Sequence, residues 1–597
     1  MLNNEIKRSD MEKWVVQAKR ADFEQWSREL GIDVVTARIL RNRDIEDLEE
    51  AKRFLFGGMK DIHSPWLLKD MDKAVGCILE AVNTGKKIRI IGDYDVDGVT
   101  STYILCKGLE CIGAQVSTAI PHRIHDGYGL SDGLVTDAHN DNIDLIVTCD
   151  NGISAKDQID LANELGMQVV ITDHHEVPFV LEQDGKHQIL PDALAVVNPK
   201  RYDCEYPFKG ICGAMVAYKL ICALREKDNA DRLNEAVMDE LLIFAAIGTV
   251  CDVMELKDEN RIVVREGIKR IATTDNYGLR ALIEVNKLSP EKISAYHFGF
   301  VIGPCINATG RLDTAERALG MFRAKSEAEA LVTAVELKAL NDSRKNLTLE
   351  GIEAAEKYVK DNNLAQKAVW VIFLPEVHES IAGIIAGRIR ERYNHPVFIL
   401  TRGEEMVKGS GRSIDGYHMQ EHLVEVGELL EKYGGHAMAA GLSLKEDNLV
   451  KLEEALNENA GLVEEDFVAK VSIDVPMPFA YASLHLAKEI EKLEPYGTGN
   501  PHPLFAQKDL ELYGIVPFGA EKQYCRLKVR TPEGKNAEIT CFEHPEQINK
   551  FLNEKYGAGS SEKLARGNCA FKINATYQLG INNYRGENLQ FMLKNYM

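Results

Sequence analysis

Four groups of acidic and histidine residues, each directly after an apolar run, constrain this chain more than any other feature. They read Asp93-Tyr94-Asp95-Val96-Asp97-Gly98, Asp150-Asn151-Gly152, Asp173-His174-His175 and Gly248-Thr249-Val250-Cys251-Asp252. Gathering carboxylates and imidazoles in one place is costly, because like charges repel and each group loses water. A site built from them usually holds divalent cations, and oxygen-rich ligand sets with one or two His suit Mg²⁺ or Mn²⁺.

Short β-rich runs alternate with helical stretches around the first three groups. Residues 88–91, 143–147 and 168–171 read as strands, with helices near 98–112 and 154–165 between them. This βαβ rhythm predicts an α/β fold, a parallel sheet with helices on both faces. The acidic groups would then lie at the carboxyl edge of the sheet, where open α/β sheets place their ligands.

Changes of pattern along the 597 residues indicate several domains, and the length alone suggests about three to five. Residues 326–361 read as one long helix, and the turn-rich run 494–501 leads into short alternating strands typical of a small β-barrel. The predicted parts are an N-terminal helical segment at 1–48, a parallel-sheet domain at 49–325, a connecting helix at 326–362, a smaller α/β lobe at 363–464 and an OB-like barrel domain at 465–597.

Charge and cysteine usage limit the partners and the compartment. The net charge of −21 argues against a generic nucleic-acid coat, although residues 501–597 hold 13 Lys and Arg against 10 Asp and Glu, a local charge of +3. The chain shows no apolar run of about 18 residues and no apolar signal core at its start. The twelve Cys form no C-x-x-C pair. We therefore expect a cytoplasmic protein with free thiols and no membrane contact.

Each acidic group also has a simpler interpretation. The Asp93 group superficially resembles a calcium loop, but an EF-hand needs Glu at its twelfth position, which is Ile104 here. It could instead be a solvated acidic turn, Asp150 could merely cap a helix, and a His pair alone is more often structural. Adjacent His on an extended backbone point in different directions, so one can bind metal while the other contacts phosphate. A buried Asp252 without a cation would be costly.

Taken together, the four groups resemble the DHH phosphoesterase superfamily, which is named for its Asp-His-His triplet. Further motifs are similar to those of its bacterial single-strand-specific exonucleases, and the resemblance covers residues from about 50 to about 510. These motifs are Arg123 with Gly127-Tyr128-Gly129-Leu130, Asn307-Ala308-Thr309-Gly310-Arg311, Gly409-Ser410-Gly411-Arg412-Ser413, Gly434-Gly435-His436-Ala437-Met438-Ala439-Ala440-Gly441 and Pro495-Tyr496-Gly497-Thr498-Gly499-Asn500-Pro501.

The resemblance implies a metal-dependent 5′→3′ exonuclease that degrades single-stranded DNA to mononucleotides in repair and recombination. It implies two Mn²⁺ or Mg²⁺ ions in the first lobe, a second lobe of the DHHA1 type, and an OB-like barrel that holds the strand. By the family pattern, the partners are single-stranded DNA, a single-strand-binding protein and a helicase. Polarity and protein partners rest on the resemblance alone.

The same pattern implies roles for individual residues. Asp95 and Asp150 would hold one ion, and Asp97, Asp150, His174 and Asp252 the other. His175 would face the scissile phosphate, Arg311 would grip phosphate bidentately, and Asp93 would act beside the ligands. Arg412 and His436 would lie in Gly-rich turns that bind the nucleic-acid end. The implied nucleic-acid contacts are Arg123, Asn307, Arg311, His378, Arg388, Ser410, Gly411, Arg412 and His436.

Two positions depart from the superfamily pattern. Ile91 stands where some members carry His, four positions before Asp95, which predicts weaker binding of the first ion. Val377 replaces the Trp that usually precedes the equivalent of His378. Three other functions stay open: a DHH phosphodiesterase of short oligonucleotides or cyclic dinucleotides, a pyrophosphatase of the same superfamily, and a non-catalytic DNA-binding scaffold. The terminal barrel argues against the first two, and the complete acidic set against the third.

Overall fold

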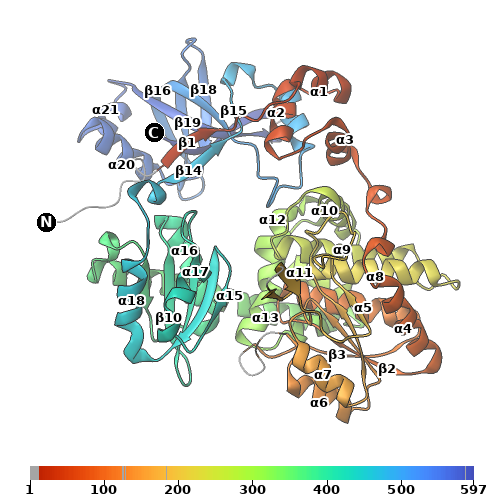
Figure 1. The fold of residues 1–597 in the computed structure, drawn as a ribbon. Helices are drawn as coiled ribbons and strands as arrows, with labels where there is room; N and C mark the ends of the chain where they lie inside the picture. The colour runs from red at the N-terminus through yellow and green to blue at the C-terminus, as the bar shows by residue number, and fades with distance from the viewer. Residues whose placement is uncertain (1–11, 124–126, 128, 183–184, 585) are drawn as a thin grey trace. The chain divides into compact units, whose positions relative to one another are not determined.

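The β-rich runs before the acidic groups form neighbouring strands of a five-stranded parallel sheet (Figure 1). Its order is β3 (Gln115–Ala119), β2 (Lys87–Ile91), β4 (Leu145–Cys149), β5 (Gln168–Thr172) and β8 (Ala195–Val197). Every residue of the central strand β4 is buried, as expected for an apolar strand covered on both faces. This strand ends two residues later than predicted, directly before Asp150.

The computed structural model describes residues 12–123, 127, 129–182, 185–584 and 586–597. Tyr128 of the predicted motif after Arg123 lies outside this range. The described residues form two units. One comprises Gly57–Asp466 with Gly497–Gly499, and the other comprises the described residues up to Phe56 together with Phe467–Tyr496 and Asn500–Met597.

Helices cover both faces of the parallel sheet. The apolar residues on one side of its strands pack with α4 (Met71–Thr84), α5 (Val96–Cys111), α8 (Gly213–Lys227) and α9 (Glu235–Cys251). Those on the other side pack with α6 (Asp132–Asn140) and α7 (Lys156–Glu164). The lobe also contains α10 (Asp258–Ile271), α11 (Tyr277–Val285), α12 (Ala295–His297), the π-helical turn η5 (Phe298–Ile302), α13 (Gly303–Leu312), α14 (Glu316–Phe322), and the hairpin of β6 (Phe179–Glu182) and β7 (Gly185–Gln188).

A single 35-residue helix, α15 (Glu327–Asp361), joins the two lobes of this unit. It packs against α11, α13 and α14 of the first lobe and against α16 (Glu379–Tyr393) of the second. Ser326 caps its first turn by accepting a hydrogen bond from the backbone N–H of Glu329. The predicted long connecting helix is therefore confirmed. Gly351 lies inside this helix. A Cβ at this position would lie 2.3 Å from the side chain of Ile385 in the second lobe, so a glycine permits the close approach.

The second lobe has a mixed sheet of order β12 (Lys432–Gly435), β13 (Ala439–Leu444), β11 (Val407–Arg412), β10 (Val397–Arg402) and β9 (Trp370–Phe373). Strands β9 and β10 pair in parallel, and the other pairs are antiparallel. Besides α16, the lobe contains α17 (Met419–Glu425) and α18 (Leu449–Glu458).

The second unit contains the predicted barrel. Its strands pair in the order β16 (Phe505–Phe518), β17 (Tyr524–Arg530), β18 (Asn536–Cys541), β20 (Asn588–Tyr596) and β19 (Phe571–Asn582). The sheet closes because β19 also pairs with β16. Among the described residues, no helix has the length and apolar character needed to cross a membrane. The unit also contains β1 (Glu12–Val16), α1 (Phe23–Leu30), α2 (Val34–Asn42), α3 (Leu48–Phe56), β14 (Ala469–Ile473), β15 (Val475–Pro476), α19 (Leu484–Glu491), α20 (Pro545–Tyr556) and α21 (Ser560–Ala565).

The N-terminal helices share one apolar core with the barrel. Strand β1 pairs in parallel with β14, and Arg43 forms a buried two-point ion pair with Asp474, with nitrogen–oxygen distances of 2.6 and 3.1 Å. Residues 1–48 were expected to form a segment of their own. In the structure, the described part of that segment belongs to a larger unit with the barrel.

Candidate metal centre and nucleic-acid contacts

Three neighbouring strands bring the acidic groups together. Strand β2 leads to Asp93, β4 to Asp150 and β5 to the Asp-His-His triplet, and β2, β4 and β5 are adjacent in the sheet. Asp252 reaches the same place from the carboxyl end of α9. Three overlapping groups have ligand atoms within 4.8 Å of one another: Asp93, Asp95 and Asp150; Asp97, His174 and Asp252; Asp150, His174 and His175.

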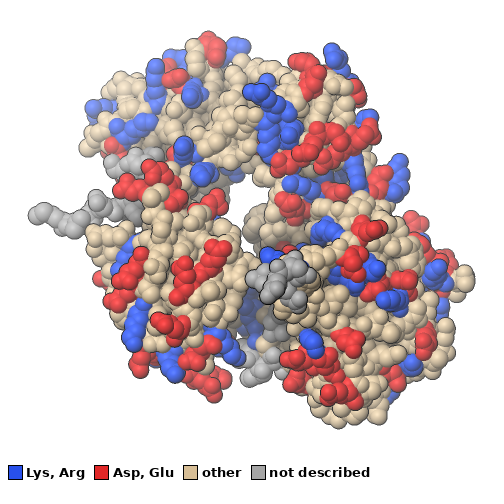
Figure 2. All heavy atoms as spheres, viewed as in Figure 1, with Lys and Arg blue, Asp and Glu red and all other residues tan. Residues whose placement is uncertain are grey.

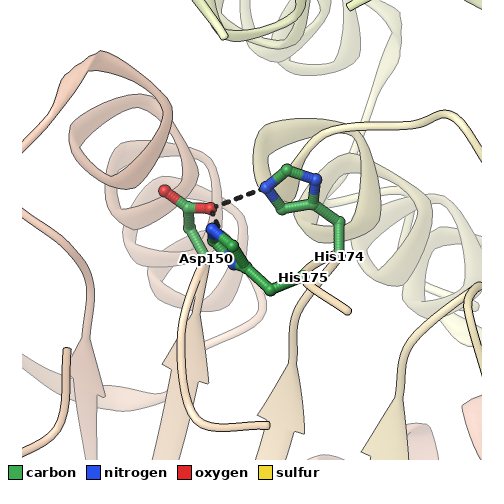
Figure 3. A group of neighbouring side chains, drawn as sticks. All are labelled: Asp150, His174 and His175. Atoms are coloured by element: carbon green, nitrogen blue, oxygen red, sulfur yellow. Dashed lines mark hydrogen bonds and ion pairs between the residues drawn. The ribbon is translucent and has the colours of Figure 1, made fainter. Parts of the chain in front are cut away.

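Asp150 lies at the middle of this constellation. Its Oδ1 is 3.0 Å from Nε2 of His174 and 3.9 Å from Nδ1 of His175 (Figure 3). The backbone of Asp150 has a φ of 62°, a left-handed conformation that Asp tolerates better than most residues. This turn directs its carboxylate toward both imidazoles. The two His side chains were expected to diverge, but their ring centroids are only 4.5 Å apart.

Asp97 has two tasks in the structure. Its two carboxylate oxygens accept hydrogen bonds from the backbone N–H groups of Gly213 (2.6 Å) and Ala214 (2.9 Å), at the start of α8. Its Oδ2 also lies 3.6 Å from Nε2 of His174. Each carboxylate oxygen has a second lone pair, so anchoring α8 leaves Asp97 able to bind a cation.

Two glycines are required by close approach in this region. A Cβ on Gly248 would lie 2.6 Å from Oδ1 of Asp97. A Cβ on Gly310 would lie 2.3 Å from the backbone oxygen of Tyr94. These glycines allow α9 to approach the first turn of α5, which carries Asp97, and α13 to approach the loop that carries Asp93 and Asp95.

The crowding of carboxylates shifts their protonation. Burial and the charge of Asp95 raise the pKa of Asp93 to about 8. Burial, then Asp97 and Asp95, raise the pKa of Asp252 to about 8, and burial with four neighbouring Asp raises the pKa of Asp150 well above its ordinary value. A bound divalent cation would reverse these shifts, because it is the largest local charge.

Asp173 positions the second His of the triplet, a role that sequence reasoning missed. Its buried Oδ1 lies 2.8 Å from Nδ1 of His175 and accepts the backbone N–H groups of His174 and His175. Although burial favours the neutral ring, the hydrogen bond and charge of Asp173 raise the pKa of His175 to about 9. The pKa of His174 is lowered by burial.

A cavity of about 280 Å³ joins the acidic groups to three of the predicted nucleic-acid contacts, Arg123, Asn307 and Arg311. The guanidinium of Arg123 lies over the ring of Tyr94, 4.9 Å from its centroid. Arg311 donates to the backbone carbonyl of Ser380. Burial and the nearby Arg123 and Arg344 lower the pKa of Arg311 to about 10, so it keeps its charge at neutral pH.

The predicted Gly-rich turn at Arg412 is wrong, because residues 407–412 form strand β11. Ser410 pairs with Ile399 and Gly441 in neighbouring strands. A Cβ on Gly411 would lie 2.6 Å from the ring of Phe398, so this glycine serves packing within the lobe. The side chain of Arg412 lies near Gly383 of α16, and a Cβ there would be 3.1 Å from its Nη2.

The other predicted contacts of the second lobe are more exposed. His378 caps α16 through the backbone N–H of Ser380. Arg388 forms an ion pair of 3.1 Å with Glu391 at the surface. His436 lies in the tight turn between β12 and β13, as predicted, where its backbone N–H donates to Ala439.

Sequence reasoning also missed Arg390. After burial, its charge is the cause that lowers the pKa of Arg412. Its buried Nε has no hydrogen-bond partner among the described residues. Arg388 and Arg390 are two positions apart on one helix, so they point to different sides, and nothing in the local pattern indicates which of them turns toward Arg412.

The acidic centre fits divalent cations. Its donor set is rich in carboxylate oxygens and includes the imidazole of His174, which suits Mg²⁺ or Mn²⁺. Oδ2 of Asp252 is buried and has no hydrogen-bond partner in the described part of the chain. This oxygen lies 3.6 Å from Nε2 of His174, so a cation between them would satisfy both groups.

Family comparisons agree with this geometry. The "DHH family, N-terminal domain" matches residues 87–249, the "DHHA1 domain" matches residues 366–462, and the "RecJ OB domain" matches residues 473–595. A parallel sheet with these acidic groups at its carboxyl edge, followed by a DHHA1 lobe, defines a DHH phosphoesterase.

Individual relatives show which family of DHH phosphoesterases the chain belongs to. The chain is 35% identical over 516 residues to the single-stranded-DNA-specific exonuclease RecJ of Salmonella typhimurium, covering 82% of this chain and 86% of the relative. It is 33% identical over 534 residues to RecJ of Bacillus subtilis, covering 89% of this chain but only 65% of that longer relative. The chain belongs to the RecJ family.

Solved structures give the same fold. The crystal structure of Thermus thermophilus RecJ in complex with Mn²⁺ matches 98% of this chain and 80% of that protein, with a TM-score of 0.79 and 27% identity. The complex of that protein with Mg²⁺ matches with a TM-score of 0.74 and 26% identity. Both ions predicted from the ligand types are therefore found in structures of this family.

Proposed function

We propose that this chain is a metal-dependent exonuclease that degrades single-stranded DNA in the 5′→3′ direction, to mononucleotides, in DNA repair and recombination. The observation that carries the proposal is the convergence of five Asp and two His at one sheet edge, beside a cavity lined by Arg123 and Arg311. Membership of the RecJ family supports the substrate. Polarity is supported by the resemblance alone.

The proposed ligand sets follow the three overlapping groups. Asp150 belongs to two of them and would bridge the two ions. Asp95 would complete one set, and Asp97, His174 and Asp252 the other. Asp93, first predicted to lie beside the ligands, shares a group with Asp95 and Asp150. It is therefore also available as a ligand where other superfamily members use the His that is Ile91 here.

The side chains around the ions have separate tasks. When bound, the cations lower the pKa of a water molecule and stabilise the leaving oxygen. The ring of His175 would hold a phosphate oxygen, since its hydrogen bond to Asp173 fixes its orientation and raises its pKa to about 9. Arg311 and Arg123 offer planar guanidinium groups, which bind phosphate in two-point fashion. The protein itself thus positions the phosphate and stabilises its charge.

DNA affinity must come from local groups rather than from overall charge. Lys and Arg are interspersed with Asp and Glu over the face shown in Figure 2, and the chain carries a net charge of −21. The half-buried Arg311, Arg412 and Arg390 place guanidinium groups inside the unit that contains the metal centre. These groups favour binding of a single strand at a few defined points over non-specific coating of a nucleic acid.

Replacing Asp173 with Asn should lower kcat by about 10- to 100-fold, the scale observed when a partner that orients a metal-site His is removed. The pKa of His175, raised to about 9 by Asp173, should fall in the variant. NMR titration of His175 and steady-state kinetics measure both effects. Asp144→Asn is the matched control, because Asp144 accepts the N–H of Lys87 at the opposite edge of the sheet. Unchanged kcat together with an unchanged His175 pKa would contradict this role.

Arg412→Ala should raise the KM for long single strands by about tenfold or more, because losing a charge-assisted contact costs about 1.5–3 kcal/mol. Arg388→Ala should have a much smaller effect, since the Arg388 side chain is 58% exposed and already paired with Glu391. Equal KM values for wild type and Arg412→Ala would show that Arg412 does not bind the single strand. A larger effect at Arg388 would transfer the role to that residue.

The proposed function is tested by digesting single strands labelled at the 5′ or the 3′ end, beside a blunt duplex and a cyclic dinucleotide. We expect early release of the 5′ label as mononucleotide and little attack on the duplex. Early release of the 3′ label would overturn the polarity. Preferential cleavage of the cyclic dinucleotide would favour the alternative phosphodiesterase, and binding without cleavage in Mn²⁺ would favour a scaffold.

We further propose that the chain acts in the cytoplasm. All twelve Cys are free in the structure, although Cys525 and Cys541 face each other across paired strands. Free thiols in such numbers suit a reducing compartment. A single-strand-binding protein and a helicase stay predicted partners, on the resemblance alone.

A further inference from the structure

Two exposed aromatic rings stack on each other near the metal centre. Tyr296 and Phe300 are each 62% exposed. Their ring centroids are 5.0 Å apart and the ring planes are inclined by only 24°. Single exposed apolar residues are common on protein surfaces, but clustered exposed apolar surface usually marks a binding site. This pair takes no part in the ligand sets or in the cavity described above.

The element that carries the pair is held firmly. Helix α12 begins with a capping box, in which the backbone N–H of Ser294 donates to Nδ1 of His297 at 3.1 Å. The following π-helical turn η5 packs against the end of α9, where Sγ of Cys251 lies 3.5 Å from the carbonyl oxygen of Phe298. Cys251 directly precedes the candidate ligand Asp252. The aromatic pair is therefore fixed relative to the metal centre by contacts within one lobe.

The burial pattern connects the pair to the phosphate-binding residues. Along α12, η5 and α13 (Figure 1), His297, Gly299 and Val301 are half-buried, and one series of surface positions runs through Tyr296, Phe300, Pro304, Asn307 and Arg311. The intervals of three and four residues are those of one helix face. Asn307 and Arg311 line the cavity at the metal centre. At about 1.5 Å per residue, Phe300 lies about 16 Å along the helix from Arg311.

We propose that Tyr296 and Phe300 form a stacking platform for bases of the single strand whose terminal phosphate lies at the metal centre. This inference rests on the proposed function and adds a binding site to it. Aromatic faces next to a positively charged phosphate site are the common means of holding single strands, because every base has a π-face. At about 16 Å from Arg311, the platform meets bases a few nucleotides inward from the reacting end.

A purely structural role predicts a different result. Aromatic pairs four residues apart can stabilise a helix slightly by contact with each other, and such a role would move thermal stability but not DNA binding. The high exposure of both rings limits what they contribute to the core. The two interpretations therefore separate in a measurement that follows binding and folding in the same variants.

The test uses the full-length protein with Tyr296→Ala, Phe300→Ala and Phe300→Leu. Phe300→Leu keeps an apolar side chain but removes the π-face, so it remains informative if the alanine variants fold poorly. We expect the KM for a long single strand to rise about fivefold to a hundredfold for each variant, on the scale of one lost base–aromatic stack. Tyr296→Phe should retain the wild-type KM. Phe56→Ala, with an equally exposed ring (61%) at the end of α3, is the matched control.

A series of oligonucleotides with one abasic site, moved a nucleotide at a time from the 5′ end, locates the contact. Wild type should lose affinity at one or two positions, and the variants should lose no further affinity there, since effects at interacting groups are not additive. Equal KM values and an identical abasic pattern in folded variants would overturn the platform. If wild type degrades no single strand, the proposed function is wrong. Fluorescence anisotropy with the same oligonucleotides then still shows whether Tyr296 and Phe300 bind the bases.

Discussion

Replacement of Asp150 with Asn is expected to reduce hydrolysis of single-stranded DNA on the order of 10⁴-fold or more, as when a group that acts at the reacting centre is removed. Asp150 belongs to two of the three candidate ligand groups, so one substitution weakens both cation sites. Asn is the appropriate replacement because it has the same shape and tolerates the left-handed backbone at φ 62°.

Binding separates this effect from misfolding. Arg123 and Arg311 are untouched in Asp150→Asn, so affinity for a single strand should largely survive. Asp157→Asn, on the exposed first turn of the neighbouring helix α7, is the matched control and should retain normal turnover. Turnover by Asp150→Asn within a few-fold of wild type in Mn²⁺ would show that Asp150 does not bridge the ions.

The second large effect concerns stability. Arg43→Met is expected to destabilise the unit that contains the barrel by about 3–5 kcal/mol, because it leaves Asp474 buried without its partner. Both side chains of this pair are almost fully buried, and Arg43 also donates to the carbonyl oxygen of Pro501 at 2.9 Å. Hydrogen exchange measured by mass spectrometry during urea unfolding would locate the loss in this unit.

Two comparisons sharpen the stability prediction. The double variant Arg43→Met/Asp474→Leu should recover part of the loss, since removing both buried charges costs less than removing one. Arg530→Met breaks an exposed pair with Glu511 in the same unit and should cost about 1 kcal/mol or less. An effect of Arg43→Met no larger than that of Arg530→Met would mean that the N-terminal helices and the barrel do not depend on this pair.

The metal centre was the part most open to prediction from sequence. Buried parallel strands are short, continuous apolar runs, so the chain indicates where β2, β4 and β5 end. An acidic residue directly after such a strand must lie at the edge of the sheet. The same logic cannot reveal the task of Asp173, since its contact with His175 depends on the rotamers of adjacent side chains.

Long-range packing explains what the pattern could not predict. Nothing near Arg43 indicates that its partner is Asp474, 431 positions later. The glycines at 409 and 411 are typical of a turn, yet they lie in strand β11, where a Cβ would clash with Leu400 and Phe398. Glycine is needed at these two positions because the neighbouring side chains leave no room for a Cβ, and this is visible only in the folded lobe. The exposure of Tyr296 and Phe300 likewise depends on which helix face the rest of the lobe covers.

We propose that the carboxylates at the sheet edge hold two divalent cations that act on a single strand. Calorimetric titration of metal-free protein with Mn²⁺, with hydrolysis of a 5′-labelled single strand followed at each addition, tests it most directly. Wild type should bind two ions per chain, with activity that appears as the sites fill, and Asp150→Asn should lose both the bound ions and the activity. Full activity in the metal-free protein, or unchanged stoichiometry and turnover in Asp150→Asn, would contradict it.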